Sequence, residues 1–183
     1  MSFMFQHAYD FNQDLDCWDV SHVEDMRAMF CCAFSFNGAI DTWDVSSVTD
    51  MNSMFHNAKN FNQPIGSWNV ASVTNMSGIF CGASCFNQEL NNWDVSRVTN
   101  MDSMFCSTAR FNQPLNAWDV SSVKSMNSMF EWAKAFSQDL NRWHVKPCAF
   151  DENMFCDSPM EKNPPKWFQK LSENEESFVD DDD

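Results

Sequence analysis

The chain has 183 residues and is unusually rich in Met (13), Phe (18) and Trp (8), with only five Leu and three Ile. This length allows one domain with a core of its own. The 26 acidic and 11 basic residues give a formal net charge of −15. That charge excludes proteins that bind nucleic acid through clustered Lys and Arg, and it disfavours anionic membrane surfaces. No stretch is apolar and long enough to predict a transmembrane helix, and residues 1–10 do not have the pattern of a signal peptide.

A 25-residue period organises the chain from its first residue to about Phe155. Six Trp residues, two sets of Phe residues and two sets of Met residues recur at this period, and we call each such set a column. The Trp column is Trp18, Trp43, Trp68, Trp93, Trp118 and Trp143; the Phe5 column is Phe5, Phe30, Phe55, Phe80, Phe105, Phe130 and Phe155; the Phe11 column is Phe11, Phe36, Phe61, Phe86, Phe111 and Phe136. The unusual apolar composition is therefore a property of the repeat.

Within one unit, residues 90–114 (LNNWDVSRVTNMDSMFCSTARFNQP), the first predicted element is a short strand. Its apolar residues alternate with polar ones around Trp-Asp-Val, which is the spacing of a strand with one exposed face. A predicted short helix follows, because apolar residues recur at the spacing i, i+3, i+4, i+7 and i+10. These residues are Met101, Met104, Phe105, Thr108 and Phe111. An Asp, Asn or Ser stands immediately before each such run, where its side chain would cap the helix.

The Asn that follows each Phe of the Phe11 column lies in the predicted return loop. We expect its side chain to bond the backbone of the next coil, because stacking buries polar groups of the loop that need partners. We also expect the Trp, Val, Met and Phe columns to stack on their equivalents, with parallel rungs ~4.8 Å apart. The predicted fold is thus an α/β solenoid, a leucine-rich-repeat-like stack of 25-residue coils with short parallel strands on one face and short helices on the other.

Three segments are predicted along the chain. Residues 1–158 form the repeat solenoid, which opens with a half repeat and has about six to seven coils. Residues 159–171 form a C-terminal cap containing Trp167, Phe168 and Leu171, and residues 172–183 form a disordered acidic tail. Since no cap precedes the first coil, end-to-end self-association is one predicted use of that end.

The repeat resembles a known family. The strings FNQPIGSWNVASVTNMSGIF (residues 61–80) and FNQELNNWDVSRVTNMDSMF (residues 86–105) are similar to the BspA-like repeat, a divergent leucine-rich-repeat type also described as a mycoplasma domain of unknown function. The resemblance covers Met1 to about Phe155. It implies a leucine-rich-repeat-like fold, roles in adhesion and protein binding, and display at the cell surface.

The position between Trp and Val on the predicted strand carries the candidate site. Its residues, which we call the polar row, are Asp19, Asp44, Asn69, Asp94, Asp119 and His144. The functional prediction is that the polar row binds a protein partner. One alternative is a Ca²⁺ site built from the carboxylates, and the other is a structural role in which each Asp accepts hydrogen bonds within its own turn. No resident metal or cofactor is predicted.

Eight cysteines raise the question of disulfides. Four of them share one repeat position: Cys31, Cys81, Cys106 and Cys156. The spacing between coils would allow a Cys81–Cys106 bond. Reduced side chains between helices are the interpretation we favour, and they would indicate a reducing compartment, in contrast to the surface location that the resemblance implies. The sequence does not decide between a reducing compartment and the cell surface.

Catalysis is not predicted, because the histidines fall at scattered repeat positions and none accompanies a Ser, Cys or carboxylate in a recognisable motif. These histidines are His7, His22, His56 and His144. Trp132 interrupts its column, where an aromatic side chain would either anchor a partner or pack locally. The sequence therefore predicts a non-enzymatic module for protein–protein interaction or adhesion, with a Ca²⁺-dependent structural element as the alternative.

Overall fold

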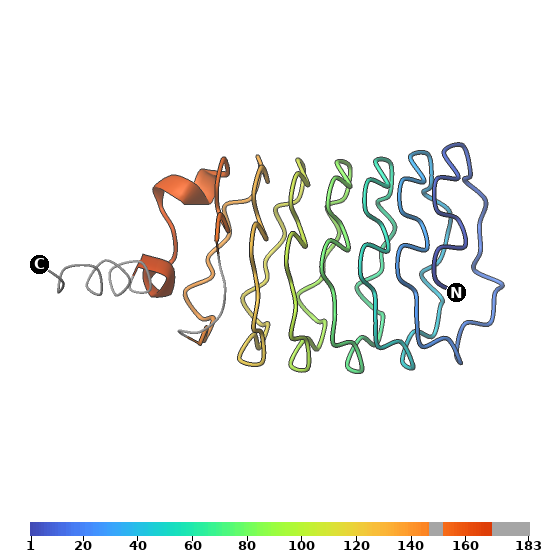
Figure 1. Ribbon diagram of the computed structural model, residues 1–183, viewed down its shortest axis with the longest axis horizontal. Coiled ribbons are helices and arrows are strands. Elements are labelled where there is room, and N and C mark those ends of the chain that lie inside the picture. Colours follow the sequence, from blue (N-terminus) through green and yellow to red (C-terminus); the bar gives the residue numbers. More distant parts are fainter. Residues whose placement is uncertain (147–151, 170–183) are drawn as a thin grey trace, which may run out of the picture.

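The computed structural model describes residues 1–146 and 152–169 of the chain. Successive coils lie side by side along one axis, with the first coil at one end and the C-terminal segment at the other (Figure 1). Hydrogen bonds between residues about 25 apart, such as Met26 N–H to the Asp50 carbonyl at 3.0 Å, join each coil to the next. The predicted repeat period is therefore the period of the structure.

The predicted α/β solenoid of strands and helices is wrong. Among the described residues, regular structure is limited to the 3-10 helix η1 (Pro159–Lys162), helical residues 166–169 and isolated parallel bridges. These bridges join Asp25 to Asp50, Asp50 to Asn75, Asn75 to Asn100, and Asn100 to Ser125. Neither a sheet nor a row of helices forms in this part of the chain, which consists mainly of turns and extended links.

The segment predicted to be a helix is a series of hydrogen-bonded turns. Alternate N–H groups donate to the carbonyl three residues earlier, as Cys31 does to Ala28 at 3.1 Å. The N–H groups between them donate to the next coil instead, as Phe30 does to Met54 at 2.8 Å. In an α-helix all these donors would bond within the segment, to the carbonyl four residues earlier. Half of the donors that a helix needs are thus committed to a neighbouring coil.

Two positions in each repeat have a positive φ, which an α-helix cannot accommodate. Each is the third residue of a turn, the place where type II turns require such a conformation. The non-glycine residues at these positions are Phe3, His7, Ala28, Cys32, Ser53, Asn57, Ser103, Ser107, Ser128, Trp132, Asn153 and Asp157. Gly78 and Gly82 occupy the same two positions in one coil, with φ of 61° and 71°. This pair of glycines, four residues apart, was a sequence signal for turns that the apolar spacing concealed.

The burial predicted for this segment is correct although its conformation is not. The five residues assigned to one helix face in residues 90–114 are all completely buried: Met101, Met104, Phe105, Thr108 and Phe111. A chain of overlapping turns and an α-helix both bring residues three or four apart to the same side. The apolar spacing therefore identified the inward side chains without deciding between the two backbones.

The aromatic columns stack along the axis, as predicted. Phe30 and Phe55 lie with ring centroids 5.6 Å apart and planes 1° apart, and Phe36 and Phe61 repeat this arrangement at 6.0 Å and 4°. Within one coil the Phe30 and Phe36 rings stack at 3.9 Å. The two Phe columns thus form one double stack through the core, and both are fully buried from Phe30 onward as far as Phe136.

The Trp column combines apolar burial with a hydrogen bond. Each indole N–H donates to a backbone carbonyl of the preceding coil, because a buried indole N–H without an acceptor would be costly. These pairs are Trp43 to Leu15, Trp68 to Ile40, Trp93 to Ile65, Trp118 to Leu90 and Trp143 to Leu115, at 2.8–3.2 Å. Throughout residues 1–146 and 152–169, no buried side-chain nitrogen or oxygen lacks a hydrogen-bond partner.

The Asn side chains bond the next coil, as predicted. The Oδ1 atom of each accepts the backbone N–H of the equivalent residue 25 positions later. The pairs run from Asn12 to Asn37, Asn37 to Asn62, Asn62 to Asn87, Asn87 to Asn112 and Asn112 to Ser137, at 2.7–3.0 Å. This ladder of amides fixes the register of the return loops.

At the C-terminal end, Trp167 continues the Trp column after a step of 24 residues. Its ring stacks on Trp143 at 6.3 Å, and its indole N–H donates to the Leu140 carbonyl at 2.9 Å. Phe168 contacts Phe155 edge to face at 5.1 Å. The two aromatic residues assigned to the predicted cap thus cover the last coil, whereas Leu171 and the predicted acidic tail lie outside the described residues.

The positive-φ positions make a testable prediction. Ser107 has φ of 56° and is exposed, and Ser107→Val is expected to lower the free energy of unfolding by about 1–2 kcal/mol because a β-branched side chain is strained there. Ser67→Val is the control, at an exposed position without a positive φ. Urea unfolding measures both, and equal losses would contradict the turn geometry.

The Asn ladder makes a second prediction. Asn37→Ala leaves the Asn62 N–H without its acceptor, so the free energy of unfolding is expected to fall by about 1 kcal/mol. Asn92→Ala, at an exposed Asn without a side-chain hydrogen bond in the described structure, should change it by less than about 0.5 kcal/mol. Thermal unfolding of the two variants side by side provides the measurement, and indistinguishable midpoints would refute a stabilising role for the ladder.

Candidate functional site

The polar row lies exposed along one side of the coil stack. Its four middle members each stand between a buried Trp and a buried Val, so the predicted alternation of burial holds there without a strand, whereas Trp18 beside Asp19 is exposed and Val145 beside His144 is partly buried. Where the coils are regular, the Trp rings beside neighbouring members stack, as Trp43 and Trp68 do at 6.3 Å. The structure therefore places all six residues, Asp19, Asp44, Asn69, Asp94, Asp119 and His144, at equivalent exposed positions in successive coils.

Each acidic member of the polar row accepts hydrogen bonds within its own turn. The Asp44 Oδ1 atom accepts the Ser46 backbone N–H at 3.0 Å, and Asp94 and Asp119 accept the N–H of Ser96 and Ser121 in the same way. Asn69 does so with Ala71 at 3.2 Å, and Asp19 accepts both the N–H and the hydroxyl of Ser21. The structural role that the sequence suggested thus accounts for one oxygen of each side chain.

These hydrogen bonds also set the charge of the row. Donation from the Ser hydroxyl, and then from the Ser N–H, holds the pKa of Asp19, Asp44, Asp94 and Asp119 below the usual range of an Asp carboxyl. All four are therefore ionised at neutral pH. Asn69 separates them into two adjacent pairs, and like charges within each pair oppose the effect of the Ser donors.

The polar row was also compared with the ligand set that a metal ion requires. Among residues 1–146 and 152–169, no group of three or more His, Cys, Asp or Glu side chains is arranged to hold a metal ion. Calcium takes six to eight oxygen ligands, whereas the polar row brings only two carboxylates side by side in each pair.

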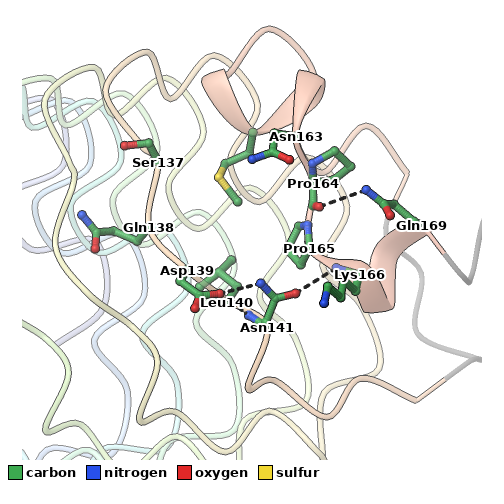
Figure 2. A pocket seen from close by; sticks show the side chains of 11 residues that line it. Ser137, Gln138, Asp139, Leu140, Asn141, Asn163, Pro164, Pro165, Lys166 and Gln169 are labelled. Carbon is green, nitrogen blue, oxygen red and sulfur yellow. Dashed lines mark hydrogen bonds between the residues drawn. The ribbon is translucent and has the colours of Figure 1, made fainter.

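A cavity of about 390 Å³ lies between the last regular coil and the C-terminal segment (Figure 2). Its polar groups bond one another: the Asn141 Oδ1 atom accepts the Lys166 backbone N–H at 3.0 Å, and the Asp139 Oδ1 atom accepts the Asn141 side-chain amide at 2.7 Å. The Gln169 amide donates to the Pro164 carbonyl at 3.3 Å. These contacts attach the C-terminal segment to the stack.

Aromatic and cationic side chains meet at another edge of the coils. The exposed Trp132 lies under the Lys134 ammonium group at 4.4 Å, and Lys59 lies over Phe34 at 4.6 Å. The sequence had drawn attention to Trp132 alone. Phe34 and Lys59 were missed because they belong to different coils. They are 25 residues apart and so share one repeat position, which was the signal that they lie side by side.

The chain belongs to a family described as Mycoplasma protein of unknown function, DUF285, whose model matches residues 1–96 and again residues 64–168. The two overlapping matches agree with the tandem repeat and with the mycoplasma-type family that the sequence resembled. No curated protein matches the chain. Among the described residues, no helix has the length and apolar character needed to cross a membrane.

The hydrogen bonds of the polar row predict a pH dependence. Because a lowered carboxyl pKa adds stability that is present above the ordinary pKa, the contribution of Asp94 should be lost as the pH falls through its folded pKa, below about 4. Ser96→Ala removes the hydroxyl donor and should move the Asp94 pKa back towards its usual value in an NMR titration. The Asp44 pKa in the same variant should stay low, and an unchanged Asp94 pKa would exclude Ser96 as the cause.

Proposed function

We propose that this chain is a non-enzymatic module that binds a protein partner through the polar row, and that the partner presents basic side chains to it. The observation that carries the proposal is the set of four exposed, ionised carboxylates, each held in the same turn geometry. A complementary row of Lys or Arg would neutralise charges that lie beside one another in the free protein.

The rigidity of the row supports the proposal. The Asp44 side chain is tied to its own turn through Ser46, and the backbone of that turn lies against buried Trp43 and Val45. A partner would therefore order few side chains on binding, which lowers the entropic cost of association. Each Asp of the row is exposed to solvent, so the second oxygen of its carboxylate is available to a charged donor.

The resemblance to BspA-like repeats supports the same class of function, since adhesion and protein binding are the roles that this resemblance implies. Family membership itself assigns no activity, because the family is described as having an unknown function. The four histidines lie at different repeat positions, and only His56 is partly buried. A binding module accounts for an exposed row repeated in register more directly than an enzyme, which concentrates its reactive groups at one place.

A charge-only variant tests the proposal. The combined change of Asp19, Asp44, Asp94 and Asp119 to Asn removes four charges but keeps the Oδ1 acceptor of each turn, as Asn69 does naturally. Quantitative pull-down from a lysate of the source cells should show at least a ten-fold loss of a basic partner, because its salt bridges to the row are gone. Capture by the native chain should also weaken as salt is raised.

A matched control carries four neutralised acids away from the row: Asp10→Asn, Asp14→Asn, Glu89→Gln and Asp139→Asn. It has the same net charge as the charge-only variant, and it should retain the partner. Equal capture by the native chain and the charge-only variant would refute the proposal. An equal loss in both variants would show that total charge, and not the polar row, determines binding.

A further inference from the structure

The repeat position that carries four cysteines forms another column, in which Cys31 is buried and Cys81 and Cys106 are partly exposed. Its members are Gln6, Cys31, His56, Cys81, Cys106, Glu131 and Cys156. Only Cys81 and Cys106 are cysteines in neighbouring coils, since His56 separates Cys31 from Cys81 and Glu131 separates Cys106 from Cys156. All seven cysteines of the described residues are free thiols, and Cys148 lies outside them.

The backbone holds Cys81 and Cys106 in register. On one side of Cys81 the Phe80 N–H donates to the Met104 carbonyl at 3.1 Å, and on the other side the Gly82 N–H donates to the Cys106 carbonyl at 2.8 Å. Backbones hydrogen-bonded in this way lie ~4.8 Å apart. That separation falls within the range of about 4.4–6.8 Å between the Cα atoms of a disulfide.

The two thiols also leave their coils in the same direction. Cys81 and Cys106 are each the last residue of a turn whose N–H donates three residues back, to Gly78 and Ser103, both at 3.1 Å. Gly78 and Ser103 have similar positive φ values of 61° and 53°, so the two turns have the same shape. Each thiol influences the pKa of the other, as expected of two side chains that lie close together.

The pair is chemically asymmetric. Hydrogen bonding from the Cys81 thiol, supported by the Ser107 hydroxyl, lowers the pKa of Cys106 to about 7, although burial and the Glu131 carboxylate of the next coil oppose this. The same interaction and burial raise the pKa of Cys81. His56, on the other side of Cys81, is uncharged at neutral pH because burial lowers its pKa. Cys106 is therefore suited to be the attacking thiolate and Cys81 the thiol that completes the bond.

Small molecules can reach the pair. Both cysteines are partly exposed, and a shallow hollow of about 300 Å³ beside Cys81 is also lined by His56, Gly78 and Ser103. A hydroperoxide is small enough to enter such a hollow. The hollow is lined by Cys81 and not by Cys106, but Cys106 is itself partly exposed and its lowered pKa favours the thiolate, which are the two conditions for reaction with an oxidant.

We propose that Cys81 and Cys106 form an oxidisable dithiol that hydrogen peroxide converts to a disulfide between adjacent coils. The Cys106 thiolate attacks one peroxide oxygen, the O–O bond breaks, and hydroxide leaves and takes up a proton, so Cys106 becomes a sulfenic acid. The Cys81 sulfur then attacks the Cys106 sulfur, and the sulfenic oxygen leaves as water with the Cys81 proton. The two thiols lose two electrons, and one peroxide is reduced to two waters.

The experiment treats the reduced full-length chain with one equivalent of hydrogen peroxide, blocks the remaining thiols and maps the peptides by mass spectrometry. A Cys81–Cys106 link is expected as the main product, with the loss of two thiols and full recovery by dithiothreitol. The thermal midpoint should rise on oxidation, because the bond joins two adjacent coils and constrains the unfolded chain. Iodoacetamide labelling should show a lower pH midpoint for reduced Cys106 than for reduced Cys81.

Single variants distinguish the two roles. Cys81→Ser should accumulate a Cys106 sulfenic acid that dimedone traps, whereas Cys106→Ser should slow oxidation of Cys81. Cys156→Ser, in the same column but without a cysteine neighbour, should leave the link unchanged. The contact of 3.8 Å between the Cys31 and Cys32 sulfurs is an internal competitor. A Cys31–Cys32 product in place of the proposed link, or random pairing of the thiols, would overturn the proposal. Both outcomes are measured by peptide mapping of the native chain.

Discussion

The backbone hydrogen bonds that pass from one coil to the next are the constraint on which the rest of this structure depends. Every second N–H of the turn segment donates forward, as Phe30 does to Met54, and the intervening donors bond within their own turn. Neither kind of bond suffices alone, because a buried backbone group without a partner is costly. A single coil would therefore be unstable, because the N–H groups that donate forward find their acceptors only in the next coil.

This pattern explains why the core consists of columns. Once the backbones are in register, equivalent residues lie one coil apart, and flat rings can stack at that distance, as Phe55 and Phe80 do at 5.9 Å. Branched aliphatic side chains form a buried column of the same kind, which contains Ile40, Ile65, Leu90, Leu115 and Leu140. Trp adds an indole donor that reaches the preceding coil, and the Asn side chain adds an acceptor on the opposite side of the same coil.

The same register produces the surfaces for which we propose functions. A residue at a given repeat position is repeated along the stack, so an exposed Asp becomes the polar row and two equivalent cysteines become a pair. The turn that follows Asp94 donates to its carboxylate and fixes its charge. The turn that precedes Cys106 places its thiol beside that of Cys81. The hydrogen bonds within each turn and the register between coils together determine the arrangement of side chains on each surface.

The sequence by itself determined the repeat, the inward residues, the Asn ladder and the positions of the polar row, because a period of 25 is visible without coordinates. The conformation of each unit was decided only by the tertiary structure. Met101, Met104 and Phe105 have the spacing of a helix face, but turns place the same residues inward. Turns form because alternate N–H groups of this segment donate to carbonyls of the next coil. A helix satisfies its own N–H groups, whereas these turns need the next coil, and the apolar spacing within a single repeat does not contain that information.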